Sequence, residues 1–271
     1  MRYWKGSISL SPTRDYPLLR HVLHSGFVTH NQLFEFLRLD YSASSRNAFN
    51  NRVHRLVQHG LLVRQEMPFV NREVVYSVSP AGASELVGRG EYYVPPTRKG
   101  TWNTAQSSLH HSLELNEIHL ALKRSGTLVH WMPETEIRSR NDLTDSGYWK
   151  YYDAIVTVRL AGQDYKFALE YERTPKAARQ YIAIRERIEQ EATIAFFLYL
   201  VPNHDLLRFV ADKLSGCRQA VYFGLFQDFL AQTLALPIRR NGSPASVSLN
   251  SILTHSKTSQ RSGILFPSID V

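Results

Sequence analysis

The fold is decided by residues 148–174, which read Tyr148-Trp-Lys-Tyr-Tyr-Asp-Ala-Ile-Val-Thr-Val-Arg-Leu-Ala-Gly-Gln-Asp-Tyr-Lys-Phe-Ala-Leu-Glu-Tyr-Glu-Arg-Thr174. Two runs that alternate between apolar and polar residues flank a four-residue turn, residues 161–164, and this pattern predicts a β-hairpin. If Leu160 pairs with Tyr165, then Ile155 lies opposite Glu170 and Asp153 lies opposite Glu172. The expected register therefore gathers three carboxylates at one end of one face of the hairpin.

The three carboxylates are Asp153, Glu170 and Glu172, and they predict a metal site. Like charges that face one another across a strand pair repel unless a cation or a proton lies between them. An all-oxygen set of ligands suits Mg²⁺ or Mn²⁺. The opposite face is entirely apolar, with Ala154, Val156, Val158, Phe167, Leu169 and Tyr171. The alternative is a solvated polar face whose charges are neutralised by three basic residues of the same stretch: Arg159, Lys166 and Arg173.

Composition favours a polyanionic partner in a reducing compartment. The chain has 271 residues, and 32 Lys and Arg against 24 Asp and Glu give a net charge of +8, which points to nucleic acid. Its single cysteine, Cys217, cannot form an internal disulfide, so we expect a cytoplasmic location. No stretch has the length and apolarity of a membrane span or signal peptide, and we expect no membrane partner.

The first part of the chain predicts three short helices followed by two strands. Residues 1–14 are expected to form a weakly ordered arm, and the helices are expected at 16–25, 29–39 and 45–59. Residues 61–63 and 73–78 then form two strands around a turn, which is the pattern of a wing. This organisation predicts a DNA-binding domain over residues 1–87 and resembles winged helix-turn-helix domains of the MarR-like kind.

The third expected helix has the surface that a major-groove reader needs. Its apolar positions repeat at helical spacing, and no acidic residue occurs between Ser42 and Arg64. Arginine pairs with guanine and asparagine with adenine, and both reach phosphates. We therefore predict double-stranded DNA as a partner, bound by polar residues of this helix and one of the wing: Arg46, Asn47, Asn50, Asn51, Arg55 and Arg72. The alternative is an ordinary soluble helix with its polar residues in water.

The remaining chain predicts a linker, a second domain and a tail. Residues 88–104 are rich in Gly, Pro and Tyr and are expected to be the linker. Residues 239–271 have few large apolar side chains, and we expect a flexible C-terminal tail. Between them, over residues 105–238, helices are expected at 106–125, 176–191, 203–215 and 227–236, and extended segments at 127–132, 135–140, 193–201 and 220–225, besides the hairpin.

This second domain resembles the restriction-endonuclease-like fold, whose motif is an Asp followed by Glu-x-Lys. The corresponding residues are Asp153, Glu170 and Glu172, and Glu172 stands where the family has its lysine. Lys176 or Arg179 would supply the missing positive charge from the following helix. The expected fold class is therefore a two-domain α+β/α/β protein, an N-terminal winged helix-turn-helix followed by a restriction-endonuclease-like PD-(D/E)xK α/β core.

Both domains together, over residues 15–236, resemble the plasmid replication-relaxation family and the MobC class of mobilisation relaxases. The shared features are a His-containing helix, Trp131-x-x-Glu134, the Asp153-Ala pair and the Glu-x-Glu-Arg-Thr of residues 170–174. The resemblance implies metal-dependent DNA nicking at a plasmid or mobile-element origin, in which Mg²⁺ or Mn²⁺ activates the nucleophile. It implies five candidate acids: Glu117, Glu134, Asp153, Glu170 and Glu172.

Two further interpretations stay open at this point. One is a DNA-binding replication or transcription regulator whose nuclease-like domain has lost activity, and the other is a winged-helix regulator with an unrelated ligand-binding domain. The departure at Glu172 favours the first of these, whereas retention of all three carboxylates favours the enzyme. A homodimer and coupling or accessory proteins are expected partners of either.

Overall fold

The computed structural model describes residues 8–41, 45–66, 73–94, 102–145, 147–194, 196–243 and 245–261, with side chains except in 102–105 and 256–261. The chain forms two compact units, each made of two segments. The first unit comprises Met1–Arg124 and Pro133–Gly147, and the second comprises Ser125–Met132 and Tyr148–Val271. The architecture is mixed α/β, with a three-stranded sheet in the first unit and a seven-stranded mixed sheet in the second.

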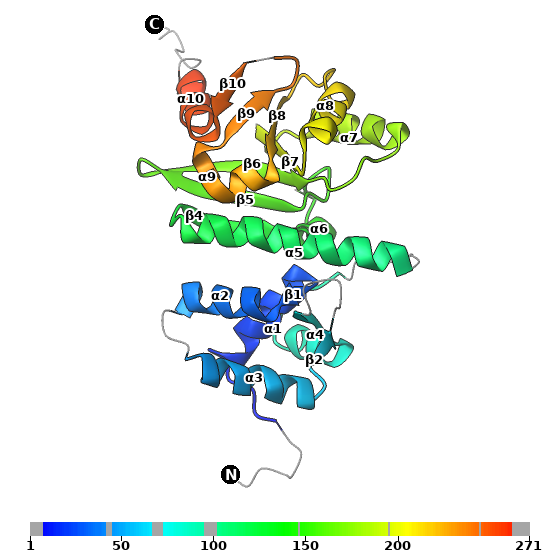
Figure 1. Ribbon diagram of the computed structural model, residues 1–271, viewed down its shortest axis with the longest axis vertical. Coiled ribbons are helices and arrows are strands. Elements are labelled where there is room, and N and C mark those ends of the chain that lie inside the picture. Colours follow the sequence, from blue (N-terminus) through cyan, green and yellow to red (C-terminus); the bar gives the residue numbers. More distant parts are fainter. Residues whose placement is uncertain are drawn as a thin grey trace, which may run out of the picture. The chain divides into compact units, whose positions relative to one another are not determined.

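The first unit is built from six helices and three strands among the described residues (Figure 1). They are α1 (Asp15–Ser25), β1 (Val28–Thr29), α2 (His30–Tyr41), α3 (Arg46–Gln58), β2 (Leu62–Glu66), β3 (Val74–Val78), α4 (Pro80–Val87), α5 (Trp102–Arg124) and α6 (Glu134–Leu143). Strand β3 lies between β1 and β2 and is antiparallel to both. The three helices predicted near the N-terminus and the hairpin after them are confirmed.

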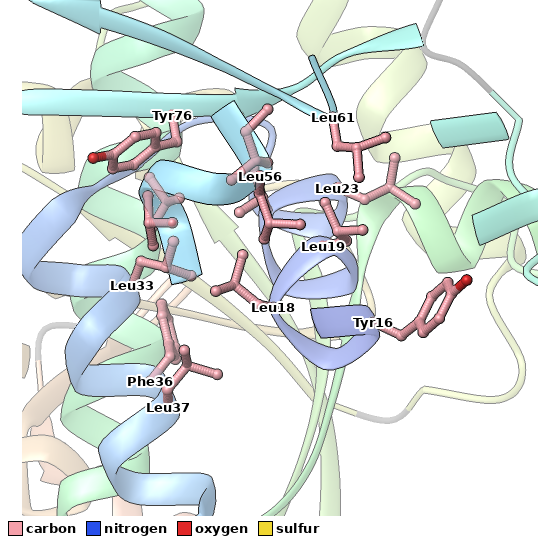
Figure 2. Packing of buried hydrophobic residues seen from close by; sticks show 14 of the residues in the cluster. Tyr16, Leu18, Leu19, Leu23, Leu33, Phe36, Leu37, Leu56, Leu61 and Tyr76 are labelled. Atoms are coloured by element: carbon pink, nitrogen blue, oxygen red, sulfur yellow. The ribbon is translucent and has the colours of Figure 1, made fainter. Parts of the chain in front are cut away.

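The core of the first unit is a cluster of leucines and aromatic rings from α1, α2, α3 and the sheet. Figure 2 shows Leu18, Leu19, Leu33 and Leu56 converging between α1, α2 and α3. All four are fully buried, and burying a leucine contributes about 1.5–3 kcal/mol. Leu120 of α5 belongs to the same cluster.

The sequence predicted the domain boundary in a linker at 88–104. In the structure the first unit continues to Arg124, because α5 packs against the N-terminal helices. Gln32 donates a hydrogen bond to the Leu113 carbonyl at 2.8 Å, and Asn116 donates one to the Phe27 carbonyl at 2.8 Å. Helix α6 joins the same unit, where His24 of α1 meets Thr135 at 2.7 Å. The extended segment predicted over 135–140 was therefore wrong, since these residues are helical.

The second unit contains seven strands and four α-helices among the described residues. They are β4 (Leu128–Pro133), β5 (Ala154–Leu160), β6 (Gln163–Tyr171), α7 (Ala178–Gln190), β7 (Phe196–Val201), α8 (His204–Lys213), β8 (Ala220–Leu225), α9 (Phe226–Gln232) with the 3-10 turn Thr233–Ala235, β9 (Pro237–Arg240), β10 (Ser246–Ser248) and α10 (Leu249–Arg261). The strands lie side by side in chain order from β4 to β10, as Figure 1 shows. Pairs β6–β7 and β7–β8 are parallel, whereas β5–β6, β8–β9 and β9–β10 are antiparallel.

Helices cover both faces of the central strands. Tyr181 of α7 contacts Glu172 at the end of β6, and its ring packs edge-on against Phe209 of α8. Tyr171 points to the opposite face, where its ring meets Phe226 of α9, because successive strand residues alternate between faces. Strand β7 is therefore buried along its whole length, as its continuous apolar run predicted.

The flexible tail predicted from residue 239 was wrong as far as the structure describes that region. Residues 237–240 and 246–248 form an antiparallel pair at the edge of the sheet. Leu249 and Leu253 of α10 are buried, and their spacing of four places both on one face of the helix. Residues 262–271 lie outside the described part. No described helix has both the length and the apolarity needed to cross a membrane.

Candidate functional site

Helix α3 presents a polar, acid-free face. Ser45 caps its first turn by accepting a hydrogen bond from the Ala48 amide at 3.1 Å. Phe49, Val53 and Leu56 are buried against the core. The helix is thereby fixed with the other side outward, where five of the predicted DNA contacts are exposed: Arg46, Asn47, Asn50, Asn51 and Arg55.

Neighbouring side chains hold this face in place. The Arg46 guanidinium donates a hydrogen bond to Asn31 Oδ1 at 2.6 Å and lies 4.5 Å from the centre of the Phe34 ring. Asn50 Oδ1 lies 3.0 Å from His30 Nε2. Asn31, Phe34 and His30 all belong to α2, so α2 and α3 form one surface around Arg46 and Asn50.

Arg55, which was also predicted to contact DNA, has a different partner. Its guanidinium lies 2.6 Å from Oδ2 of Asp15 on α1, and Arg52 approaches Oδ1 at 3.2 Å. Asp15 is fully buried and also accepts a hydrogen bond from the Ser11 amide at 2.7 Å. Arg55 therefore fastens α3 to α1. Arg72 lies outside the described residues.

The hairpin of the second unit is present, but its register differs from the expected one by two residues. Leu160 pairs with Gln163 and Ala154 pairs with Leu169, so the turn is Ala161-Gly162, both with positive φ, rather than four residues long. Positive φ at both central positions is what a two-residue type I′ turn requires.

Asp153 lies one residue before the first pair of this register, and its Oδ2 accepts a hydrogen bond from the amide of Tyr171, the residue after Glu170. The faces are as predicted, since a shift of two residues returns each side chain to the same face.

The carboxylates Glu170 and Glu172 are buried, and the solvated-face alternative is therefore wrong. Their exposed fractions are 6% and 2%. Each has an ammonium partner: Lys150 binds Glu170, and Lys176 lies 2.7 Å from Glu172 Oε2. Glu172 Oε1 also accepts a hydrogen bond from Tyr181. The expected role of Lys176 as a neighbouring positive charge is thus matched by a direct ion pair.

The electrostatics of this cluster are set by burial. Burial raises the pKa of Glu170 to about 7; Lys150 opposes this shift, and Asp153 adds to it. Burial lowers the pKa of Lys176, but Glu170 and Glu172 raise it by more, so the net shift is upward. The cluster therefore keeps its lysine charged while one of its acids titrates near neutrality.

Two buried tyrosines next to the carboxylates have unpartnered hydroxyls within the described residues: Tyr152 and Tyr199. Tyr199 pairs with Glu170 across the parallel strands β6 and β7, which brings both side chains to one face. Burial raises the pKa of Tyr199, and Glu170 and Glu172 raise it further. Buried polar groups are rarely left unpaired, and two such hydroxyls lie beside these carboxylates.

Sequence reasoning missed Lys150 and Glu191. Glu191 is buried and accepts hydrogen bonds from the Trp149 amide at 3.1 Å and from Thr193 Oγ1 at 2.6 Å. It thereby fixes the segment that carries Lys150. Lys150 could have been found from the sequence, since it lies three residues before Asp153. Glu191 could not, because Trp149, whose amide it binds, lies forty-two positions earlier.

The other two acids implied by the family resemblance, Glu117 and Glu134, belong to the first unit. Glu117 accepts a hydrogen bond from Gln32 at 2.7 Å, and Glu134 accepts one from Arg138 at 2.8 Å. Both therefore have structural partners of their own.

The donor set of the second unit fits a metal ion held by two carboxylates better than one held by three. Among the described residues, no group of three or more His, Cys, Asp or Glu is arranged to hold an ion. Glu172 uses one oxygen on Lys176 and the other on Tyr181, and Asp153 Oδ2 accepts a hydrogen bond from the Tyr171 amide at 2.7 Å. Magnesium commonly binds through one or two carboxylates and keeps several waters, which Asp153 and Glu170 would match.

No protein-family model matches the chain, and no curated protein sequence matches it either. Any inference about function must therefore come from the geometry of the two sites.

Proposed function

We propose that this protein binds double-stranded DNA through α3, as a winged helix-turn-helix domain does. The observation that carries the proposal is the exposed face of α3, where Arg46, Asn47, Asn50 and Asn51 gather without an acidic residue. The order α1, β1, α2, α3, β2 and β3, with β1 pairing at the edge of the hairpin, supports this class of domain. Such a face suits both phosphates and base edges.

The direct test is duplex binding as a function of salt. Arg46→Ala should weaken binding and reduce the slope of log K against log salt by about 1, if Arg46 contacts one phosphate. Arg208→Ala is the matched control, because Arg208 is exposed on α8 of the other unit and pairs only locally with Asp205 at 2.7 Å. Equal effects of the two variants, or no salt-dependent binding by the wild type, would overturn the proposal.

A second function, metal-dependent DNA cleavage by a restriction-endonuclease-like domain, is favoured by a specific observation. Asp153 lies close enough to Glu170 to raise its pKa, and Lys150 and Lys176 bring ammonium groups to Glu170 and Glu172, where this chain lacks the lysine of the family motif. Asp153 and Glu170 would hold Mg²⁺ or Mn²⁺, which when bound would activate a water or hydroxyl nucleophile. The lysines would stabilise the negative charge that develops on phosphate.

This function is tested by relaxation of supercoiled plasmid in Mg²⁺, Mn²⁺ or EDTA. We expect Asp153→Asn and Glu170→Gln to abolish metal-dependent nicking and the metal-dependent rise in Tm. Asp164→Asn is the matched control, because Asp164 lies in the same hairpin and is exposed and paired with Arg159 at 2.7 Å. A wild type that binds duplex DNA but shows neither nicking nor a Tm shift would be the non-catalytic regulator. A plasmid or mobile-element origin as target, a homodimer and accessory proteins remain predictions.

A further inference from the structure

Arg46, the first residue of α3, is held by two residues of α2. Its Nη2 donates a hydrogen bond to Asn31 Oδ1 at 2.6 Å, and its guanidinium carbon lies 4.5 Å from the centre of the Phe34 ring. That ring packs against Phe49 of α3, with 5.2 Å between ring centres. A guanidinium with an acceptor and an aromatic ring against it has fewer accessible orientations than one surrounded by water.

Asn31 is itself oriented by the β2–β3 hairpin. Its Nδ2 donates a hydrogen bond at 3.0 Å to Oε1 of Glu73, the residue before β3. A carboxylate only accepts hydrogen bonds and a guanidinium only donates them. One orientation of the Asn31 amide therefore satisfies both neighbours, with its NH₂ group toward Glu73 and its oxygen toward Arg46. The three side chains form a chain of hydrogen bonds from the hairpin through α2 to α3.

This chain of hydrogen bonds leaves Arg46 able to bind a further group. A guanidinium carries several N–H donors, and the Asn31 oxygen accepts from one nitrogen, Nη2. Arg46 and Asn31 are both exposed, so the remaining donors can reach a ligand in solvent. Long side chains lose conformational freedom when they bind, and a side chain that is already fixed in the free protein loses less.

We propose that Asn31, oriented by Glu73, is a positioning residue for DNA binding: it holds the guanidinium of Arg46 where it pairs with a phosphate of the duplex. This inference rests on the proposed binding of DNA through α3. The charge of Glu73 acts in the opposite direction, because carboxylate and phosphate repel one another. Variants of Glu73 must therefore separate its charge from its hydrogen bond.

The first step is tested in the free protein, by ¹⁵N relaxation of the arginine side chains. The Nε–H order parameter of Arg46 should exceed that of Arg187, an exposed arginine of α7, and Asn31→Ala should lower it toward the Arg187 value. Asn31 is exposed, so we expect the variant to fold. An order parameter of Arg46 that Asn31→Ala leaves unchanged would overturn the inference, whatever the protein binds.

The second step is a double-mutant cycle in duplex affinity. Asn31→Ala should weaken binding about five-fold when Arg46 is present and should have no effect in the Arg46→Ala background. An Asn31 side chain that contacts DNA by itself would weaken binding equally in both backgrounds. One that competes with DNA for Arg46 would give tighter binding when removed. Either of these two results overturns the positioning role.

The role of Glu73 is tested by two variants that both lack its charge. Glu73→Gln keeps an oxygen that can accept from Asn31, whereas Glu73→Met has a similar size and no such oxygen. The Met variant should bind duplex about three-fold more weakly than the Gln variant, and Arg46→Ala should abolish this difference. Equal affinities of the two variants would overturn the part of the inference that concerns Glu73.

The outcomes separate this inference from the proposal beneath it. A wild type that binds no duplex at any salt concentration overturns both. Salt-dependent duplex binding that Arg46→Ala weakens, together with additive effects of Asn31→Ala and Arg46→Ala, overturns the positioning role alone.

Discussion

Both units bury carboxylates next to basic side chains, but they do so in different ways. In the first unit Asp15 pairs with two arginines of α3 and accepts a hydrogen bond from the Ser11 amide, and its ion pairs join α1 to α3. In the second unit Glu170 and Glu172 are paired with lysines, and burial raises the pKa of Glu170 to about 7.

The ion pairs of Asp15 stabilise the fold, whereas those of Glu170 and Glu172 have the properties of a functional site. Arginine is permanently charged and its planar group fixes the geometry of a carboxylate, whereas lysine is a flexible point charge. A raised pKa, as at Glu170, is typical of functional sites. We therefore interpret Asp15 as a structural residue that holds α3 against α1, and the Glu170 cluster as a candidate functional site.

The largest expected effect is the loss of stability when the ion pairs of Asp15 are removed. Asp15→Ala leaves Arg52 and Arg55 without their buried partner, and we expect the free energy of unfolding to fall by about 3 kcal/mol, at the lower end for buried pairs because both arginines reach solvent. Urea unfolding measures the change. Asp205→Ala removes an exposed carboxylate paired with Arg208 and should cost less than about 0.5 kcal/mol. Similar values for the two variants would remove the contrast between the units.

The next effect is a pH dependence specific to the second unit. The pKa of Glu170 is raised by burial from 4.5 to about 7, so the folded protein binds this proton more tightly than the unfolded chain does. The resulting stabilisation is fully present below about pH 4.5 and is lost as the pH rises through about 7, with a size of up to about 3 kcal/mol.

Urea unfolding over this pH range, in the wild type and in Glu170→Gln, isolates the contribution as the difference between the two curves. Glu186→Gln, an exposed acid on α7, is the control and should follow the wild type. A difference curve for Glu170→Gln that is flat with pH would show that Glu170 does not titrate in this window.

The smallest effect compares two buried phenols. Tyr199→Phe removes a hydroxyl without a described partner, so stability should be unchanged or rise by up to about 1 kcal/mol. Tyr181→Phe removes the donor to Glu172 and should lower stability by about 1.5 kcal/mol. Thermal unfolding of both variants is the measurement. A Tyr199→Phe variant as destabilised as Tyr181→Phe would mean that its hydroxyl is satisfied and that the two phenols are equivalent.

The faces of the hairpin could be predicted from the sequence, but its register could not. Alternation with a period of two assigns Asp153, Glu170 and Glu172 to one face under any even shift. The turn was misjudged because Gln163 and Asp164 are polar; Asp164 is instead a strand residue that pairs with Arg159. Polarity alone does not distinguish a turn from an exposed strand end.

Pairs that are distant in the sequence account for most of what was missed. The sequence shows a basic α3, but not that Arg55 turns toward Asp15 forty positions earlier. Residues 135–140 were predicted to be extended, yet they lie in α6, whose Ile137 is buried. In each case a tertiary contact outweighs the local pattern.

The two units interleave along the chain, since the first is completed only by Pro133–Gly147, after the chain has already supplied β4 to the second. A genetic exchange with a single crossover near residue 124 would therefore separate α6 from the helices that it joins. Recombination can transplant neither unit as one uninterrupted piece of coding sequence. The pair of units is expected to be inherited together, with the exposed face of α3 and the carboxylate cluster diversifying in place by substitution.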